Sequence, residues 1–382
     1  MHHSSEPPRL DPSRGPVELT RQLCDIPSVS GDETLLADAV ERLVRAAPHL
    51  HVTRDGDTII ARTELGRARR VILAGHLDTV PVNENLPVRD DRDPATGEPV
   101  LWGRGTVDMK AGVAVQLDAA LALHTPAVDC TWVWYDHEEV ESSLNGLGRA
   151  LAHHPHLFDG DFAILGEPTR AGIEGGCNGT LRARITFHGR RAHSARSWMG
   201  VNAIHRAGRF LEALATFEPE TREVDGLAYR EGLNAVRIAG GVAGNVIPDR
   251  CDLEVNYRFA PDRSAEEAVG LVRAFCLTAG ADEVEIVDFA PGARPGLDDV
   301  LARSLVRAVG GTPTAKVGWT DVSRFSALGI PAVNFGPGDP LLAHADDERV
   351  PVSQVLAAAA ALRAWLVSDP EDAALADGKS SD

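Results

Sequence analysis

The sequence contains little cysteine and very little lysine. Its five cysteines are odd in number and far apart, and no Cys-x-x-Cys pair occurs. Structural disulfides and a cysteine-based zinc site are therefore not expected. Lysine occurs only at positions 110, 316 and 379, which leaves few candidates for a Schiff-base enzyme. Carboxylates and imidazoles must carry any chemistry of this chain.

The 382 residues also include no long apolar run. No stretch approaches the ~20 apolar residues of a membrane helix, and the first fifteen residues are polar and proline-rich, unlike a secretory signal. Acidic residues outnumber basic ones by 56 to 38, which gives a formal net charge of −18. A surface this acidic repels phosphate backbones and anionic headgroups. We therefore expect a cytoplasmic protein that binds neither nucleic acid nor membranes.

Short apolar strands alternate with amphipathic helices over residues 1–175. The predicted strands span residues 58–63, 70–75, 131–135 and 162–165. The predicted helices span residues 31–48, with Asp32 as the N-cap, 109–124 and 145–153. This alternation is typical of an α/β domain whose largely parallel sheet is buried on both faces. We expect these residues to form the first part of a catalytic domain.

Residues 176–292 follow a different order. Strands are predicted at 181–187, 233–238, 251–259 and 283–289, and helices at 202–214 and 265–279. This βαββαβ order is that of a ferredoxin-like unit, which we expect to be inserted into the first domain. Residues 293–368 return to the α/β pattern, with strands near 315–317 and at 331–335 and a closing helix at 352–367. The small, polar and acidic residues 369–382 predict a disordered tail.

Polar side chains gather where the strands of the α/β domain end. They are His76 and Asp78, Glu138 and Glu139, and Glu167, with Asp108 before a helix and His344 in a late loop. Singly, a loop histidine usually forms a hydrogen bond, adjacent glutamates are usually solvated, and an aspartate before a helix is usually an N-cap. Because parallel strands end at one edge of a sheet, these side chains are expected to lie together. Like charges held together are costly unless cations neutralise them, so we predict a metal site.

Histidine and carboxylate ligands without sulfur favour a divalent metal, with zinc first and cobalt or manganese as alternatives. Five ligands divide naturally over two metals when one carboxylate bridges them. Asp78 follows His76 by two residues, so on an extended chain it faces the same way and could orient the imidazole. Glu138 and Glu139 must lie on a turn, because neighbours in a strand point to opposite faces. One of them can then bind metal while the other takes a proton from the attacking water.

Five motifs resemble, in order and spacing, those of the dinuclear zinc amidohydrolases and metallopeptidases. They are GHLDTVP, GRGTVDMKAG, the Glu138-Glu139 pair, GEPT and AHADDE. That family includes aminoacylases, acetylornithine deacetylases, carboxypeptidase G-type enzymes and succinyl-diaminopimelate desuccinylases. The resemblance covers nearly the whole chain. Within the family, GCNGTLRARITFHG and WTDVSRFSALGIPAVNFGPGD are most similar to the actinobacterial desuccinylases.

The resemblance implies two zinc ions per subunit and a role for each residue of the cluster. One metal is bound by His76 and Glu167, the other by Glu139 and His344, and Asp108 bridges them. Glu138 is the general base, Asp78 supports His76, and the Asp108-Met109 peptide is cis.

The resemblance also implies a homodimer formed by the inserted domain. His193 would reach the partner subunit's active site and stabilise the oxyanion, with Asn245 as a second polar group. Arg258 would contact a substrate carboxylate, although a surface role on its strand is an equal alternative. The expected substrate is a small N-acyl amino acid, N-succinyl-LL-2,6-diaminopimelate, cleaved to succinate and LL-2,6-diaminopimelate in lysine biosynthesis.

Two segments depart from better-known enzymes of that activity. Some of those enzymes have an arginine pair where this chain has Cys177-Asn178. Some have a small Gly-Thr-Ser-Asp loop where it has Gly318-Trp319-Thr320-Asp321. The basic residues that could compensate are Arg182, Arg190, Arg191, Lys316 and Arg324. Alternative functions are therefore acetylornithine deacetylase, a broader N-acyl amino-acid hydrolase or dipeptidase, and a metal-dependent binding protein without catalysis.

Overall fold

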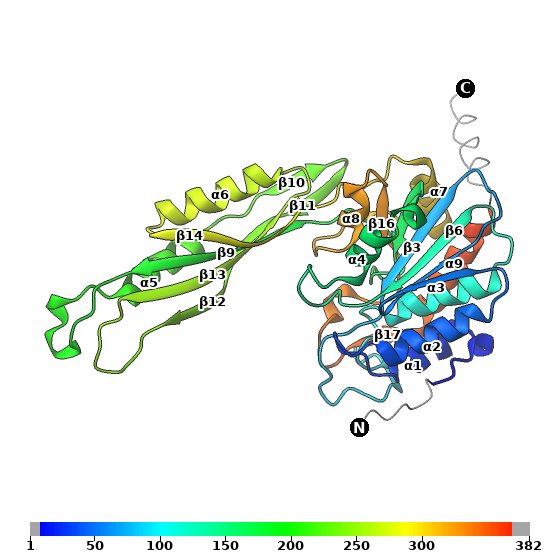
Figure 1. The fold of residues 1–382 in the computed structure, drawn as a ribbon, viewed down its shortest axis with the longest axis horizontal. Coiled ribbons are helices and arrows are strands. Elements are labelled where there is room, and N and C mark those ends of the chain that lie inside the picture. The colour runs from blue at the N-terminus through cyan, green and yellow to red at the C-terminus, as the bar shows by residue number, and fades with distance from the viewer. Residues whose placement is uncertain (1–7, 369–382) are drawn as a thin grey trace. The chain divides into compact units, whose positions relative to one another are not determined.

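The computed structural model describes residues 8–368, so the expected tail at 369–382 lies outside the described residues. The chain divides into two compact units (Figure 1). The first unit comprises residues up to 175, 296–314 and those from 324 onward, and the second comprises 176–295 and 315–323. None of the described helices is long and apolar enough to cross a membrane.

An eight-stranded mixed sheet forms the centre of the first unit. Its order is β1 (His51–Asp55), β2 (Thr58–Arg62), β6 (Asp129–Tyr135), β3 (Arg70–His76), β7 (Phe162–Leu165), β16 (Ala332–Asn334), β8 (Glu174–Gly175) and β15 (Thr314–Ala315). The four consecutive strands β6, β3, β7 and β16 are parallel. Nearly all their residues are buried, as continuous apolar runs predict. The α/β class with a largely parallel sheet is confirmed.

Helices and a small sheet complete the first unit. The helices are α1 (Gly15–Cys24), α2 (Thr34–Arg45), α3 (Lys110–Ala122), α4 (Gly146–His153), α7 (Val300–Val309) and α9 (Val352–Val367), with the short α8 (Val322–Ala327) crossing the unit boundary. The small antiparallel sheet has the order β17 (Arg349–Pro351), β5 (Pro99–Trp102) and β4 (Arg89–Arg92).

Helix α3 is buried over most of its length and packs against α1, α9 and β3. Gly112 makes its close approach to the sheet possible, because a Cβ there would lie 1.9 Å from the carbonyl oxygen of Gly166. The N-terminus of α3 follows Asp108, and Gly166 precedes Glu167. The packing of this helix therefore positions the backbone at two of the predicted ligands, Asp108 and Glu167.

The second unit contains the predicted ferredoxin-like arrangement. Its antiparallel sheet has the order β12 (Gly232–Gly240), β13 (Arg250–Phe259), β9 (Gly179–His188) and β14 (Glu283–Ala290), with α5 (Ala203–Ala215) and α6 (Ala265–Thr278) packed on it. Strands β9 and β12 run in the same direction with β13 between them, which defines a split βαβ unit. A hairpin of β10 (Thr221–Val224) and β11 (Leu227–Arg230) was not predicted.

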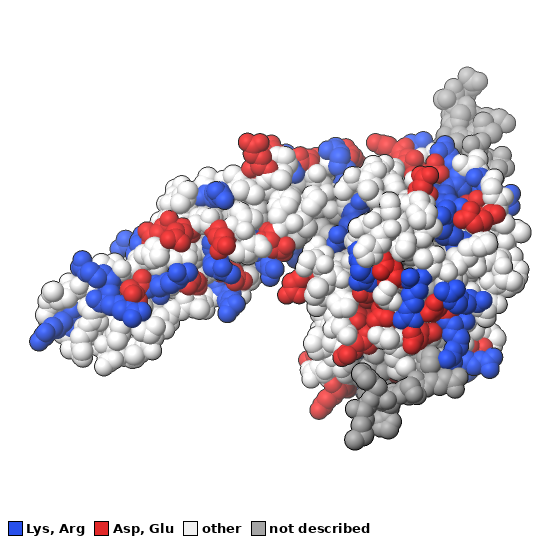
Figure 2. Space-filling view, viewed as in Figure 1, with Lys and Arg blue, Asp and Glu red and all other residues white. Residues whose placement is uncertain are grey.

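Charged side chains on this sheet form pairs between neighbouring strands. Arg184 of β9 lies 3.0 Å from Glu285 of β14, and Arg182 lies 3.4 Å from Asp288. Figure 2 shows acidic and basic side chains interspersed along the visible face of this unit. Arg182, one of the expected substrate contacts, is thus engaged by a carboxylate of its own unit.

Two details differ from the expectations. Helix α2 begins at Thr34 with Glu33 in the N-cap position, so the prediction that Asp32 caps it is wrong. Residues 315–323, expected in the returning α/β segment, group with the second unit. The Trp319 ring nitrogen and the Ser323 hydroxyl both donate to the carbonyl oxygen of Pro291, at 3.1 and 2.7 Å, which ties this segment to the second unit.

Candidate metal centre

The predicted polar residues of the first unit meet at the carboxyl end of its parallel strands. His76 is the last residue of β3 and pairs with Tyr135 of β6, directly before the segment that carries Glu138 and Glu139. On the other side of β3, strand β7 leads into Glu167. Because these strands are parallel neighbours, their ends bring the side chains to one edge of the sheet.

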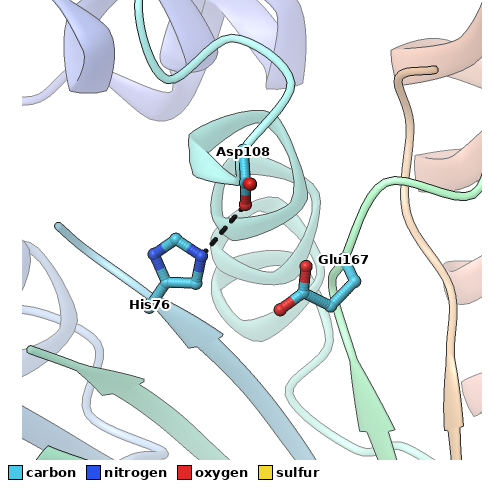
Figure 3. A group of neighbouring side chains, drawn as sticks. All are labelled: His76, Asp108 and Glu167. Carbon is cyan, nitrogen blue, oxygen red and sulfur yellow. Dashed lines mark hydrogen bonds and ion pairs between the residues drawn. The ribbon is translucent and has the colours of Figure 1, made fainter. Parts of the chain in front are cut away.

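His76, Asp108 and Glu167 point toward a common centre (Figure 3). The Nε2 atom of His76 lies 3.1 Å from Oδ1 of Asp108. Each of the three residues offers a ligand atom within 4.8 Å of the others. This group could hold one metal ion.

Asp108 also belongs to a second group of possible ligands, with Glu139 and His344. His344 Nε2 lies 2.9 Å from Oε1 of Glu139 and 3.4 Å from Oδ2 of Asp108. The two oxygens of Asp108 therefore face different imidazoles, Oδ1 toward His76 and Oδ2 toward His344. A carboxylate in this position could bridge two cations. Glu138 completes a third group with His76 and Glu139.

The loop that carries Asp108 is fixed by a buried carboxylate that the sequence analysis missed. Oε1 of Glu348 accepts from the backbone N–H groups of Val107 and Asp108, at 2.8 and 3.1 Å. Its other oxygen accepts from Arg104 at 2.8 Å. The Asp108-Met109 peptide is cis, as the resemblance implied. Glu348 ends the AHADDE motif, so its place in that motif was the available signal.

Asp78 contacts both His76 and the turn after β6. The Nδ1 atom of His76 lies 3.0 Å from the backbone oxygen of Asp78 and 3.5 Å from its carboxylate. The carboxylate also accepts from the backbone N–H groups of Glu138 and Glu139, both at 3.0 Å. Its hydrogen bonds thus fix the turn after β6, and both its backbone oxygen and its carboxylate face Nδ1 of His76.

The charges of the cluster shift the pKa values of its members. Burial opposes protonation of His76, but Asp108 and Asp78 raise its pKa well above the usual 6.5. Hydrogen bonds to Asp108 and Glu139 raise the pKa of His344 to about 10. Burial disfavours the charged form of Asp108, but the two imidazoles hold its pKa below the usual range. Imidazoles and carboxylates without sulfur, in surroundings that stabilise positive charge, fit a divalent metal.

Three further predicted residues belong to the second unit and to none of these groups. His193 and Asn245 are exposed, and their segments are joined by the Ser194 N–H, which donates to the Asn245 carbonyl at 2.9 Å. Arg258 is half-buried, and its Nε donates to the side chain of Asn256 at 3.1 Å. Burial lowers the pKa of Arg258 from its usual value.

The two segments that depart from better-known enzymes lie against each other. The buried Cys177 thiol lies 3.6 Å from the carbonyl oxygen of Thr320, and the Asn178 N–H donates to the carbonyl of Lys316 at 3.2 Å. The two segments therefore form one local cluster in the second unit, although they lie far apart in the sequence. Of the other basic candidates, Arg191 pairs with Asp249 at 2.8 Å, whereas Arg324 donates to the Ser142 hydroxyl at 3.0 Å in the first unit.

The chain is similar to known proteins over most of its length. Residues 72–368 match the model of peptidase family M20/M25/M40. The chain is 53% identical to a protein of Mycobacterium tuberculosis named as a succinyl-diaminopimelate desuccinylase, over 94% of this chain and 99% of that protein. It is 46% identical to the succinyl-diaminopimelate desuccinylase of Corynebacterium glutamicum, over 94% and 98% respectively.

Solved structures show the same fold. A tripeptidase from Staphylococcus aureus superposes with a TM-score of 0.74 at 21% identity, covering 95% of this chain and all of that one. An M20 family metallo-carboxypeptidase from Sulfolobus solfataricus superposes with a TM-score of 0.73 at 16% identity, covering 93% and 99%.

Proposed function

The chain belongs to peptidase family M20/M25/M40 and is a metal-dependent hydrolase, and from this premise we propose that it cleaves N-succinyl-LL-2,6-diaminopimelate to succinate and LL-2,6-diaminopimelate. One observation carries the proposal. Asp108 lies between two imidazoles, and Glu138 and Glu139 follow on a turn at the same edge of the sheet. The name that both relatives carry, succinyl-diaminopimelate desuccinylase, supplies the substrate.

We assign the metal ligands to two overlapping sets. His76 and Glu167 would hold one ion, and Glu139 and His344 would hold the other. Asp108 would bind both ions. Zinc suits these donors best, with cobalt or manganese as substitutes. Two such ions, when bound, polarise an amide carbonyl and lower the pKa of water toward ~7.

Glu138 is assigned as the group that moves protons. It would accept a proton from the attacking water and return it to the leaving amine. Its backbone N–H is held by the Asp78 carboxylate at 3.0 Å, which fixes the start of its side chain. The backbone N–H of Glu139 donates to the same carboxylate, so Asp78 positions both the proposed base, Glu138, and a proposed metal ligand, Glu139.

A homodimer formed by the second unit is part of the proposal. Strand β12 is an edge strand on which Val236 and Ile238 are exposed by 57% and 51%. An exposed apolar edge of this kind is suited to pairing with a second copy. His193 would then act in the partner's site. Its Nδ1 accepts from the Ala195 N–H at 3.1 Å, which leaves Nε2–H as the donor to an oxyanion.

Asn245 and Arg258 are assigned to the substrate. Asn245 would assist His193, whose segment it adjoins, and Arg258 would bind a carboxylate of the substrate. The lowered pKa of Arg258, which burial causes, indicates a guanidinium short of solvent and therefore favourable to an anionic ligand.

The test compares kcat/KM of zinc-loaded protein for N-succinyl-LL-2,6-diaminopimelate, N-acetylornithine and a dipeptide. We expect the succinyl substrate to be preferred by at least about tenfold, since a bound carboxylate contributes a charge-assisted hydrogen bond. Preference for N-acetylornithine or the dipeptide would assign the related deacylase or dipeptidase activity instead. Absence of turnover with all three would contradict catalysis.

A further inference from the structure

Two buried carboxylates accept hydrogen bonds from the turn that carries Glu138 and Glu139. Asp78 follows β3, and Glu33 precedes α2, far away in the sequence. Both side chains are fully buried. Burial raises the pKa of Glu33, and the charge of Asp78 adds to this rise. Two neighbouring buried acids are costly to maintain, so their contacts are informative.

Asp78 binds the second half of this turn, which consists of Glu138 and Glu139. Its two oxygens accept separately from the backbone N–H groups of Glu138 and Glu139. The oxygen that faces Glu139 also accepts from the Ser30 hydroxyl at 2.7 Å. Ser30 thereby fixes the rotation of a carboxylate that supports both glutamates.

Glu33 holds the first half of the same turn. Its Oε1 accepts from the backbone N–H of His137 at 3.2 Å, and its Oε2 accepts from that of Gly31 at 2.9 Å. His137 has a φ of +58°, a left-handed conformation that a non-glycine residue keeps only when its surroundings enforce it. Glu33 supplies one of the hydrogen bonds that enforce it.

The segment that carries Ser30 and Glu33 is itself anchored to the end of β3. The Thr79 N–H donates to the Ser28 carbonyl at 2.9 Å, and the Ser30 N–H donates to the Thr79 carbonyl at 3.2 Å. The Ser28 hydroxyl donates to the Leu77 carbonyl at 2.6 Å. The segment that carries Ser30 and Glu33 is therefore hydrogen-bonded to the residues that directly follow His76, the last residue of that strand.

We propose that Glu33 and Ser30 are positioning residues that fix the Glu138–Glu139 turn, and with it both the proton-transferring carboxylate and a metal ligand. Neither residue reaches the reacting atoms. Glu33 acts through the backbone of His137, and Ser30 acts through Asp78. The inference rests on the proposed function for the role of Glu138, but not for the geometry of the turn.

Glu33→Gln is the direct test, because glutamine keeps the size of the side chain and loses one acceptor. Both oxygens of Glu33 accept from backbone N–H groups, so the glutamine NH₂ would face a donor. We expect kcat to fall roughly 10- to 100-fold and KM to change little. We also expect affinity for the metal held by Glu139 to fall by a similar factor, as when partners of metal ligands are removed. Affinity is measured by titrating metal-free protein with Co²⁺ and recording its absorption.

Asp32→Asn is the matched control, because Asp32 is the adjacent acid and its side chain is exposed. It should retain wild-type kcat and Co²⁺ affinity. Ser30→Ala should lower both quantities, and Ser30→Thr, which keeps the hydroxyl, should restore them. If circular dichroism shows that Glu33→Gln does not fold, the comparison of Ser30→Ala with Ser30→Thr tests the positioning role.

Wild-type kcat and Co²⁺ affinity in folded Glu33→Gln or in Ser30→Ala would overturn the inference. If the wild-type protein cleaves none of the N-acyl substrates, the proposed function fails, and the Co²⁺ titration of the same variants still decides the positioning role. Equal losses in Asp32→Asn would show a general effect of charge and would also overturn it.

Discussion

Glu138 is the residue whose role is easiest to separate from metal binding. We predict that Glu138→Gln lowers kcat by about 10² to 10⁴, the usual contribution of a general base, because an amide cannot accept the proton. The metal content should not change, since Glu138 is not assigned as a ligand. Stopped-flow turnover and elemental analysis of the same sample check both parts. Glu141→Gln, an exposed neighbour, should behave as wild type, and near-normal turnover in Glu138→Gln would contradict the assignment.

At the residue scale the sequence predicted which side chains meet, but not what holds them. His76 ends one apolar strand, and Glu139 and Glu167 follow two others, so the parallel sheet alone brings them together. Glu33 and Glu348 act on backbone N–H groups of other loops. Such contacts leave no periodic pattern in the sequence. Glu348 was signalled only by its place in the AHADDE motif, and the role of Glu33 could be identified only from coordinates.

At the element scale, burial determined which strands were predictable. Strands β3, β6 and β7 are buried on both faces and read as apolar runs. Strand β1 is only partly buried and β4 is fully exposed, and their sequences, HVTRD and RDDR, carry no such signal. Helix α9 was predicted with its observed bounds, because a proline precedes it and an alanine-rich run fills it.

Asp129, the first residue of β6, anchors the loop that precedes β3. Its carboxylate accepts from the Thr63 hydroxyl and from the N–H groups of Leu65 and Arg67, at 2.8 to 2.9 Å. Burial opposes its charged form, but these hydrogen bonds lower its pKa below the usual 3.8. A lowered folded-state pKa adds stability that is present above pH 3.8 and is lost as pH falls through the folded-state value.

We therefore predict that Asp129→Asn lowers the free energy of unfolding by about 1 to 3 kcal/mol at pH 7, because a hydrogen-bonded buried charge is lost. The difference from wild type should shrink as pH falls below 3.8. Urea unfolding at pH 7, 5, 4 and 3 measures it. A difference that stays constant or grows toward low pH would contradict the assigned role.

At the scale of the whole molecule, the exposed edge of β12 predicts how two chains assemble. Val236→Lys with Ile238→Lys should place charges on that edge and prevent strand pairing. We expect a folded monomer by light scattering, with kcat reduced about 10² to 10³ because His193, the proposed oxyanion donor, would no longer reach a partner.

Val287→Lys provides the matched control for this prediction. Val287 is an exposed valine on β14, the opposite edge strand of the same sheet. The control should remain dimeric and active. A monomeric double variant with full activity would show that His193 is not needed from a partner, and a double variant that stays dimeric would exclude the β12 edge as the interface.

Metal binding by the Asp108 cluster tests the central claim most directly. Chelator-treated protein should take up two Zn²⁺ ions per chain in isothermal titration, and activity should return with them. Asp108→Ala should weaken both binding events, whereas His344→Ala should weaken one and leave the other near its wild-type affinity. Two ions bound at wild-type affinity by Asp108→Ala, or activity that persists in metal-free protein, would contradict a dinuclear site bridged by Asp108.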